Sequence, residues 1–295
     1  MGGSCDLDPE AFTWLKVYTY RDHLAALDSV QFRQPTNAEC QHLDVGCGPG
    51  NFLSDCLLPR LRPFRRVVAI DVSPDMLQHA RRHYPQRELS YEHHDIENGD
   101  PDSLLHKYGS FDRVFAFLTF HFVSDLKKGY HNVHRLLKDS GECLTVNFTR
   151  TGITDVWHRM YQKQEWRPYL PDLRAVFAER FCFDRPVPER ELMEREKKAV
   201  TSAGLDLISC KTYRSQWVLP SVKACVDLYV PLFKLNAKVP KEKQSEFVDA
   251  LQSTIYEASG TSAGRIVFNY DSIVTHSQKR QSSLACHSCR RLEYV

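Results

Sequence analysis

Three glycines at alternate positions mark the stretch of this chain best suited to hold a ligand: Gly46, Gly48 and Gly50. An apolar run that ends at Asp44 and Val45 leads into them. Glycine is favoured where the backbone takes a positive φ or lies directly against a ligand. The order predicts a strand, a tight turn and the first turn of a helix. Asp44 then lies at the carboxyl end of the strand, where open α/β sheets bind ligands.

A second acidic residue, Asp71, ends the next apolar run, about twenty residues further on, and an acid at this spacing can accept hydrogen bonds from both hydroxyls of a ribose. Asn51 stands where the dinucleotide fingerprint G-x-G-x-x-G requires its last glycine, so the pattern here is G-x-G-x-G. The loop contains no Gly-Lys-Ser/Thr, which excludes a P-loop. A phosphate- or nucleotide-binding loop of another kind stays open as an alternative.

The elements that must position these residues alternate along the first half of the chain, after a predicted helix over residues 10–30. Apolar runs predict strands at about 40–46, 66–71, 88–94, 112–117 and 143–148. Helical patterns follow several of the strands, and one of these helices opens with Ser73 as N-cap and Pro74 as first helical residue. Strands that alternate with helices indicate an α/β fold with a doubly wound, mostly parallel sheet.

The second half of the chain has a different pattern. Residues 152–183 hold seven aromatic side chains and no strand pattern, which indicates a helical cap insertion over the carboxyl edge of the sheet or additional core. Predicted helices and strands then follow at about 189–203, 205–217, 220–235, 241–258 and 265–274. The two late strands fit an antiparallel hairpin that completes a seven-stranded sheet. We therefore expect one domain over 1–276 and a disordered tail over 277–295.

Composition and charge argue against several classes of protein. A formal net charge of +2 gives no reason to expect nucleic acid or an anionic membrane as a partner. No run of about 18 apolar residues occurs, so we expect no membrane span. The ten cysteines are not accompanied by a secretory signal, which favours free thiols and a cytoplasmic location.

Two groups of potential metal ligands lack the spacing of a metal site. The histidines at positions 79, 83, 93 and 94 follow no recognised ligand spacing, and surface or packing roles suit them better. In the tail, Cys286, His287 and Cys289 have no second pair of ligands to complete a zinc site. We expect no metal.

The glycine loop, Asp71 and the pair Asp95-Ile96 after the third strand resemble the class I S-adenosylmethionine-dependent methyltransferases. The resemblance implies a Rossmann-like fold of seven strands and S-adenosylmethionine as the cofactor. It implies that Asp71 holds the ribose, and that Asp95 and the backbone of Ile96 meet the adenine. The cofactor-binding residues that it implies are Asp44, Gly46, Gly48, Gly50, Asp71, Val72, Asp95, Ile96 and Phe117.

A closer resemblance is carried by six segments: LDVGCGPG, RRVVAIDVSPDML, DIENGD, FDRVFAFLTFHFVSD, GECLTVNF and ITDVWHRMYQKQEW. Together they resemble the arthropod juvenile hormone acid methyltransferases, which methylate the carboxylate of farnesoid acids. The likeness covers about residues 15–276. This chain departs from that family at two positions of its acid pocket. Phe122 follows His121 where tryptophan is usual, and Thr19 replaces a glutamine of the N-terminal helix.

A carboxylate is the methyl acceptor that demands least of the protein, because it is ionised at neutral pH and needs no general base. His121 is the one evident base, and it could either orient a carboxylate oxygen or serve in packing. The sequence therefore predicts an enzyme that forms the methyl ester of an apolar, isoprenoid or fatty, carboxylic acid. We place His121, Phe122 and Thr19 at its reacting centre. Two alternatives stay open: a methyltransferase for an amine or phenol, and a cofactor-binding protein without catalysis.

Overall fold

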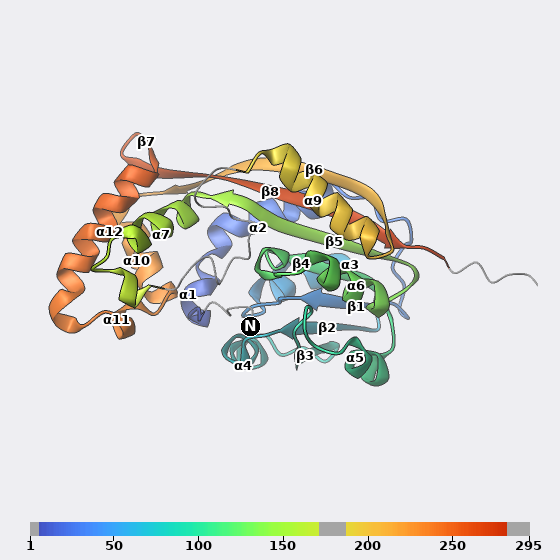
Figure 1. The fold of residues 1–295 in the computed structure, drawn as a ribbon. Helices are drawn as coiled ribbons and strands as arrows, with labels where there is room; N and C mark the ends of the chain where they lie inside the picture. Colours follow the sequence, from blue (N-terminus) through green and yellow to red (C-terminus); the bar gives the residue numbers. More distant parts are fainter. Residues whose placement is uncertain (1–5, 171–186, 282–295) are drawn as a thin grey trace, which may run out of the picture.

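A twisted sheet forms the centre of the molecule, with helices on both of its faces (Figure 1). The computed structural model describes residues 6–170 and 187–281. The sheet has eight strands in the order β3-β2-β1-β4-β5-β8-β6, and the short β7 pairs with β8. The strands are β1 (Gln41–Val45), β2 (Arg66–Asp71), β3 (Leu89–His93), β4 (Phe111–Phe117), β5 (Leu137–Thr151), β6 (Leu205–Leu219), β7 (Gly260–Ser262) and β8 (Arg265–Lys279).

The pairing of the strands confirms the doubly wound fold that the sequence predicts. β1 pairs in parallel with β2 and β4, β2 with β3, and β4 with β5. β8 pairs antiparallel with both β5 and β6, which is the predicted closing hairpin. The sheet has eight strands rather than the seven predicted because the chain turns back at residues 263–264 to add β7 beside the start of β8.

Helices connect the strands and form the outer layers. They are α1 (Pro9–Thr13), α2 (Lys16–Asp28), the π-helix η1 (Leu53–Leu57), α3 (Leu58–Leu61), α4 (Pro74–His83), α5 (Pro101–Tyr108), η2 (Phe120–Phe122), α6 (Leu126–Leu136), α7 (Gly152–Gln162), η3 (Arg167–Tyr169), α9 (Glu189–Ser202), α10 (Val222–Leu232), α11 (Leu235–Lys238), η4 (Lys241–Lys243) and α12 (Gln244–Ala258). The predicted cap of α4 is confirmed, because the Ser73 hydroxyl accepts from the Met76 N–H. Among the described helices, none combines the length and hydrophobicity that a bilayer crossing requires.

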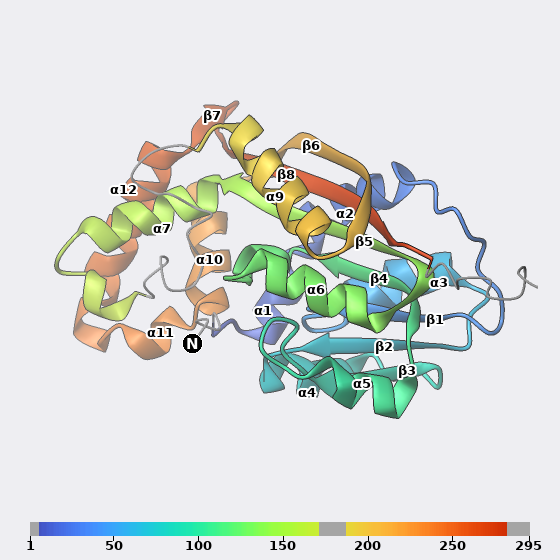
Figure 2. The same cartoon turned by 45° about the vertical axis from the view of Figure 1, so that its right-hand side comes forward.

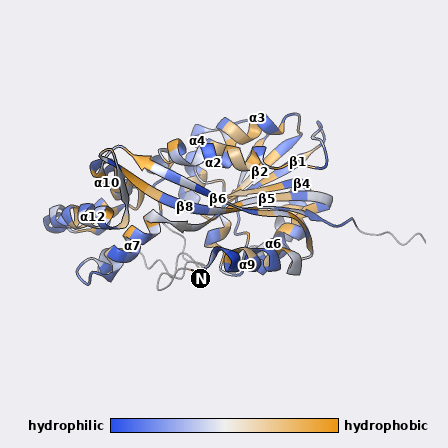
Figure 3. Ribbon diagram, turned by 90° about the horizontal axis from the view of Figure 1, so that it is seen from above, coloured by the Kyte–Doolittle hydropathy of each residue, from blue (hydrophilic) through white to orange (hydrophobic). Residues whose placement is uncertain are grey.

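The two faces of the sheet have separate apolar cores, since successive side chains of a strand point to opposite sides. Val68 and Ile70 of β2 pack with residues of α5, α6 and α9. Their neighbours Val67 and Ala69 pack on the other face with α2, α3 and α4. Figure 3 shows apolar and polar positions mixed along the outer helices. Burial on both faces makes the middle of β2 continuously hydrophobic, whereas β1 also carries the polar residues Gln41, His42 and Asp44.

A third core lies at one end of the long strands β6 and β8, where α7, α10, α11 and α12 gather (Figure 2). Trp157 and Met160 of α7 pack there with Tyr229 of α10 and Leu251 of α12. The described part of the aromatic-rich segment, residues 152–170, therefore supplies core. Three aromatic residues of the segment 152–183, Phe177, Phe181 and Phe183, lie outside the described residues.

Several predicted boundaries need correction. The sequence predicts that the helix after the glycine turn reaches Leu58 and that a loop opens at Pro59, but the helix continues through Pro59 to Leu61. A π-helical turn precedes Pro59, and such a turn widens the backbone where proline cannot donate the usual hydrogen bond. Helix α5 has no counterpart among the predicted elements. It begins at Asp100, whose side chain accepts from the Asp102 N–H as a cap.

The last strand is also longer than predicted. β8 continues to Lys279 because Ser277 pairs with Cys143 of β5, and Lys279 with Leu205 of β6. The predicted tail over 277–295 therefore begins inside the sheet, and residues 282–295 lie outside the described residues.

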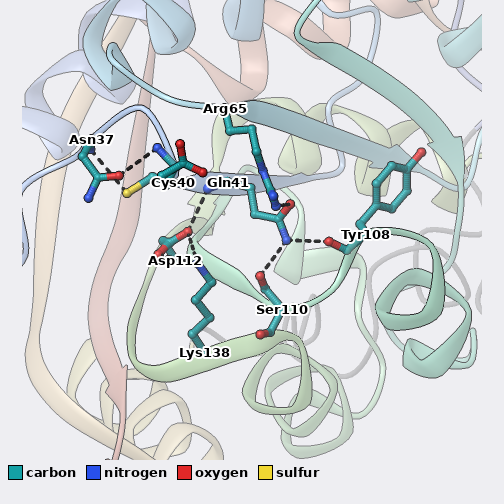
Figure 4. A network of polar contacts seen from close by, with 9 residues as sticks. Asn37, Cys40, Gln41, Arg65, Tyr108, Ser110, Asp112 and Lys138 are labelled. Carbon is teal, nitrogen blue, oxygen red and sulfur yellow. Dashed lines mark hydrogen bonds and ion pairs between the residues drawn. The ribbon is translucent and has the colours of Figure 1, made fainter.

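A polar network fixes the amino ends of β1 and β4, opposite the glycine turn (Figure 4). The Gln41 N–H donates to Asp112 Oδ2 at 2.8 Å, and Lys138 Nζ lies 2.8 Å from the same carboxylate. The Gln41 side chain accepts from Arg65 Nη2 at 2.7 Å and donates to the Tyr108 carbonyl at 2.8 Å. Because Gln41 is 1% exposed, these bonds set the strand register from within the protein.

Candidate cofactor and substrate site

A cleft opens at the carboxyl ends of β1, β2 and β4, at the edge that carries the glycine turn. Most of the site residues predicted from the sequence line it: Thr19, Asp44, Gly46, Gly48, Asp71, Val72, Asp95, Ile96, Phe117 and Phe122. Two of the predicted residues, Gly50 and His121, are not among the lining residues. The described residues contain no group of three or more His, Cys, Asp or Glu side chains that could hold a metal ion.

The glycine turn is held against the end of β2 by backbone hydrogen bonds. The N–H groups of Gly46 and Cys47 both donate to the Ile70 carbonyl, at 2.7 and 3.0 Å. Gly46 has φ +70° and Gly48 has φ +55°, values that favour glycine. The Gly48 N–H donates to Asp71 Oδ2 at 2.9 Å, so the turn and the acid form one unit.

The Asp71 carboxylate is oriented from two sides. Besides Gly48, the Ser73 N–H donates to Asp71 Oδ1 at 2.8 Å. Burial raises the pKa of Asp71, while backbone hydrogen bonds, that from Ser73 foremost, act in the opposite direction. Each oxygen keeps a further lone pair for a ligand hydroxyl. The geometry thus provides a fixed acceptor suited to a ribose.

Asp44 lies next to Asp71 in the floor of the cleft and is 4% exposed. Burial, with a smaller contribution from the charge of Asp71, raises the pKa of Asp44 to about 7. Because the neighbouring Asp71 carboxylate disfavours the ionisation of the buried Asp44 carboxyl, a ligand that brings positive charge suits this place. The floor of the cleft is therefore suited to a cationic group.

Gly50 serves packing rather than the cleft. It has φ +86°, and a side chain there would place its Cβ 2.9 Å from Tyr91 Oη and 3.0 Å from Ala80 Cβ. Those atoms belong to β3 and α4. The third glycine of the motif consequently allows the turn to lie against the next strand and helix.

The other rim of the cleft follows β3. The Asp95 carboxylate accepts from the Glu97 N–H at 2.8 Å and from Asn98 Nδ2 at 3.0 Å, which closes a tight loop. Ile96 is 4% exposed, whereas Val72 is 44% exposed although it is apolar. An exposed valine at the mouth of a cleft is available to a flat ligand such as a base.

Aromatic rings form the wall beside the first helices. Phe52 and Phe117 lie edge to face with their centroids 4.8 Å apart, and the ring of His23 lies 4.7 Å from Phe52. Thr19 stands one turn before His23 on α2 and donates to the Leu15 carbonyl at 3.2 Å. This end of the cleft is apolar apart from a few polar groups on α2.

His121 lies behind the wall. It is 2% exposed, and its ring contacts those of Phe122 at 4.2 Å and Phe148 at 5.3 Å. Phe122 itself lines the cleft. The structure therefore brings Phe122 and Thr19 to the cleft and places His121 one layer further back. Its predicted role in orienting a substrate stays a prediction.

Aromatic contacts continue from His121 into the third core. Phe148 lies 6.1 Å from Trp217, which stacks on Tyr18 of α2 at 5.4 Å. By contrast Trp157 and Trp166 are 2% and 3% exposed within the third core, and neither lines the cleft. The described aromatics of the segment 152–183 thus contact α10 and α12, in agreement with the alternative of additional core for residues 152–170.

Comparison with known proteins agrees with this arrangement. The methyltransferase domain family matches residues 43–145, from β1 into β5. The chain is 27% identical over 252 residues to the juvenile hormone acid O-methyltransferase of Bombyx mori, an alignment that covers 82% of this chain and 86% of the relative. It is 31% identical over 137 residues to that of Drosophila melanogaster, with 46% of each chain covered.

Together these findings support a class I S-adenosylmethionine-dependent methyltransferase. A solved structure of a candidate methyltransferase from Bacillus halodurans superposes with a TM-score of 0.53 at 18% identity, and this alignment covers 88% of this chain and all of that one. At such identity the likeness concerns the fold alone. The resemblance inferred from the sequence motifs is confirmed.

Several residues of the methyltransferase cleft were not predicted from the sequence. They are Leu7, Phe12, Lys16, Tyr20, His23, Cys47, Asn51, Phe52, Met76, His94, Glu97, Asn98 and Thr119. One signal was available for part of this set. Lys16, Tyr20 and His23 lie three, four or seven residues apart with Thr19 between them, which places all four on one side of a helix.

A substitution at Gly46 tests how closely the glycine turn packs against Thr119. A Cβ at Gly46 would overlap the side chain of Thr119, whose hydroxyl donates to the Val45 carbonyl at 2.9 Å. We expect Gly46→Ala to lower the free energy of unfolding by about 2 kcal/mol, from backbone strain and this overlap.

Urea unfolding without cofactor measures this loss, and Gly48→Ala is the matched control. Gly48 also has a positive φ, but a Cβ added there would lie 3.8 Å from its nearest neighbour, the side chain of Phe12. Gly48→Ala should therefore show the strain without the overlap. Equal losses in the two variants would contradict a steric role of Thr119.

Proposed function

We propose that this methyltransferase transfers a methyl group from S-adenosylmethionine to the carboxylate of an apolar isoprenoid or fatty acid. The observation that carries the proposal is one continuous cleft, which joins the glycine turn and Asp71 to walls formed by Phe52, Phe117 and Phe122. Similarity to relatives named juvenile hormone acid O-methyltransferase supports a carboxylic acid as the acceptor.

The donor set at the glycine turn fits the cofactor. S-Adenosylmethionine carries sulfonium and ammonium charges, which suit the buried carboxyl groups of Asp44 and Asp71. The free lone pairs of Asp71 would receive the ribose hydroxyls. Asp95 would accept from the adenine amino group, and Val72 and Ile96 would pack against the base. When bound, the cofactor supplies an electrophilic methyl group.

The protein's own contribution is to place and desolvate the acid. A carboxylate is ionised at neutral pH, so no residue has to remove a proton from it. Orientation of two reactants in a closed site is worth about 7–11 kcal/mol. Phe117 and Phe122 would exclude water beside the reacting oxygen, and Thr19 would offer its hydroxyl. His121 would hold the ring of Phe122 in place.

An apolar chain gains from these walls in proportion to the area it buries, at roughly 25 cal/mol per Å². A chain of a dozen carbons therefore gains several kcal/mol, on the order of 0.8 kcal/mol for each buried CH₂. A charged amine would gain little of this and would lose hydration in the same place. The walls thus favour a long apolar acid over a small amine.

The proposal is tested by incubating the protein with radiolabelled S-adenosylmethionine and a panel of acceptors. The panel holds farnesoic acid, fatty acids of several lengths, the alcohol farnesol, a phenol and a small amine. We expect base-labile methyl esters from the isoprenoid or fatty acids and no product from farnesol, which has the same chain without the carboxylate. Faster methylation of the amine or the phenol than of any acid would overturn the proposal.

A further inference from the structure

His23 is a buried polar side chain that faces the cleft without a partner. It lies on α2, is 6% exposed and lines the cleft. Neither ring nitrogen has a hydrogen-bond partner among the described residues. Its ring is held by Phe52 at 4.7 Å and by Phe117 at 5.1 Å, measured between centroids.

The imidazole of His23 is neutral in this setting. Burial alone lowers the pKa of His23 to about 3, so at neutral pH one nitrogen carries a proton and the other accepts. A buried N–H that lacks an acceptor is costly, and nearly all such groups in native proteins have a partner. Because His23 faces the cleft, a ligand can provide that partner.

The surroundings indicate the chemistry of this partner. Lys16, Thr19 and His23 lie at helical spacing on one side of α2, and all three line the cleft. They present an ammonium group, a hydroxyl and an imidazole, while the carboxyl groups of Asp44 and Asp71 lie at the glycine turn. A ligand that is cationic at one end and anionic at the other would match this arrangement.

We propose that His23 donates a hydrogen bond to a ligand carboxylate held between α2 and the rings of Phe52 and Phe117. This inference rests on the proposed function, in which two ligands carry a carboxylate. One is the methyl-accepting acid and the other is the amino-acid part of the cofactor. Thr19 lies one helical turn away and its hydroxyl donates to the Leu15 carbonyl at 3.2 Å, so the His23 N–H is a further donor on the same side of α2.

The test compares ligands that differ by a carboxylate. S-Adenosylhomocysteine is paired with 5′-methylthioadenosine, which lacks both the carboxylate and the ammonium group of the amino-acid part, and farnesoic acid is paired with farnesol, which lacks the carboxylate alone. Binding of each is measured by calorimetry, which requires no turnover. We expect His23→Leu to weaken the carboxylate member of one pair by about tenfold or more and to leave its partner unchanged. His23→Gln, which restores an N–H donor, should recover part of the loss.

His42 provides a matched control. It is fully buried, its ring nitrogens also lack partners among the described residues, and Phe64 and Phe115 flank it. It does not line the cleft. His42→Leu should therefore leave every ligand affinity unchanged. Circular dichroism checks that the variants are folded, and His23→Phe replaces His23→Leu if the latter does not fold.

The outcomes separate the source of the carboxylate from the proposed function. If only the binding of S-adenosylhomocysteine becomes weaker, His23 contacts the carboxylate of the cofactor. If only the binding of farnesoic acid becomes weaker, His23 contacts the carboxylate of the substrate. The role of His23 is overturned if the affinities for S-adenosylhomocysteine and farnesoic acid are both unchanged. It is also overturned if both members of a pair lose affinity equally. If the wild-type protein esterifies no acid, the proposed function fails, and the cofactor pair still decides the role of His23.

Discussion

Asp71→Asn is expected to weaken the binding of S-adenosylmethionine by about 10- to 150-fold, which corresponds to 1.5–3 kcal/mol for hydrogen bonds to a charged group. The carboxylate holds the turn through the Gly48 N–H at 2.9 Å and the Ser73 N–H at 2.8 Å. An asparagine amide would direct its NH₂ group at one of these donors. The variant therefore loses the charged acceptor for the ribose and loosens the turn that carries it.

Calorimetric titration with S-adenosylmethionine measures the effect, and Asp100→Asn is the control. Asp100 also accepts a backbone N–H, that of Asp102 at 3.0 Å, but it does not line the cleft. Because asparagine caps a helix about as well as aspartate, this replacement should leave both the stability and the affinity nearly unchanged. Wild-type affinity in Asp71→Asn would remove Asp71 from the cofactor site.

The parallel half of the fold could be predicted because its signals are local. The strand Arg66–Asp71 and the cap formed by Ser73 and Pro74 occupy the predicted residues, since a short apolar run and one capping residue determine them. Helix α5 was missed because Pro101–Tyr108 is too short to show a period. Ser140, with φ +61°, lies within β5, whereas the sequence predicts a turn over residues 139–142 and a strand that begins only at residue 143.

The two halves of the cleft, the glycine turn and the aromatic wall, also differ in how far local sequence predicts them. The glycines and Asp71 are set by a short motif, so their positions follow from spacing alone. The aromatic wall draws on Phe12, Phe52, Phe117 and Phe122, which come from four separate segments. No local pattern tells which aromatic ring faces a cleft and which faces a core. Aromatic density pointed to residues 152–183, whose described tryptophans, Trp157 and Trp166, are buried in the third core.

Asp44 should give the methyltransferase a pH-dependent stability that the variant Asp44→Asn lacks. The pKa of its carboxyl is about 7 in the folded state, compared with 3.8 when the carboxyl is not buried, as in the unfolded chain. Between these values the folded protein holds a proton that the unfolded chain has released, so stability falls as pH rises. A shift of this size corresponds to about 4 kcal/mol, lost between about pH 4 and 7.

The measurement is the difference in unfolding free energy between Asp44→Asn and the wild type in urea, from pH 4 to pH 8. The difference should grow in favour of the variant up to about pH 7 and then level off. His42→Leu gives a control of opposite sign. Burial lowers the pKa of His42 to about 4, so the wild type gains stability relative to that variant as pH rises from about 4 to 6.5.

The cofactor should reverse the effect of burial on Asp44. A cationic ligand beside the carboxyl favours its ionised form, so its pKa should fall when S-adenosylmethionine binds. Binding at pH 6 should then release a proton, which calorimetry detects by repeating the titration in buffers of different ionisation enthalpy. Asp44→Asn should bind without this release. Equal proton release by variant and wild type would show that the titrating group lies elsewhere in the cleft.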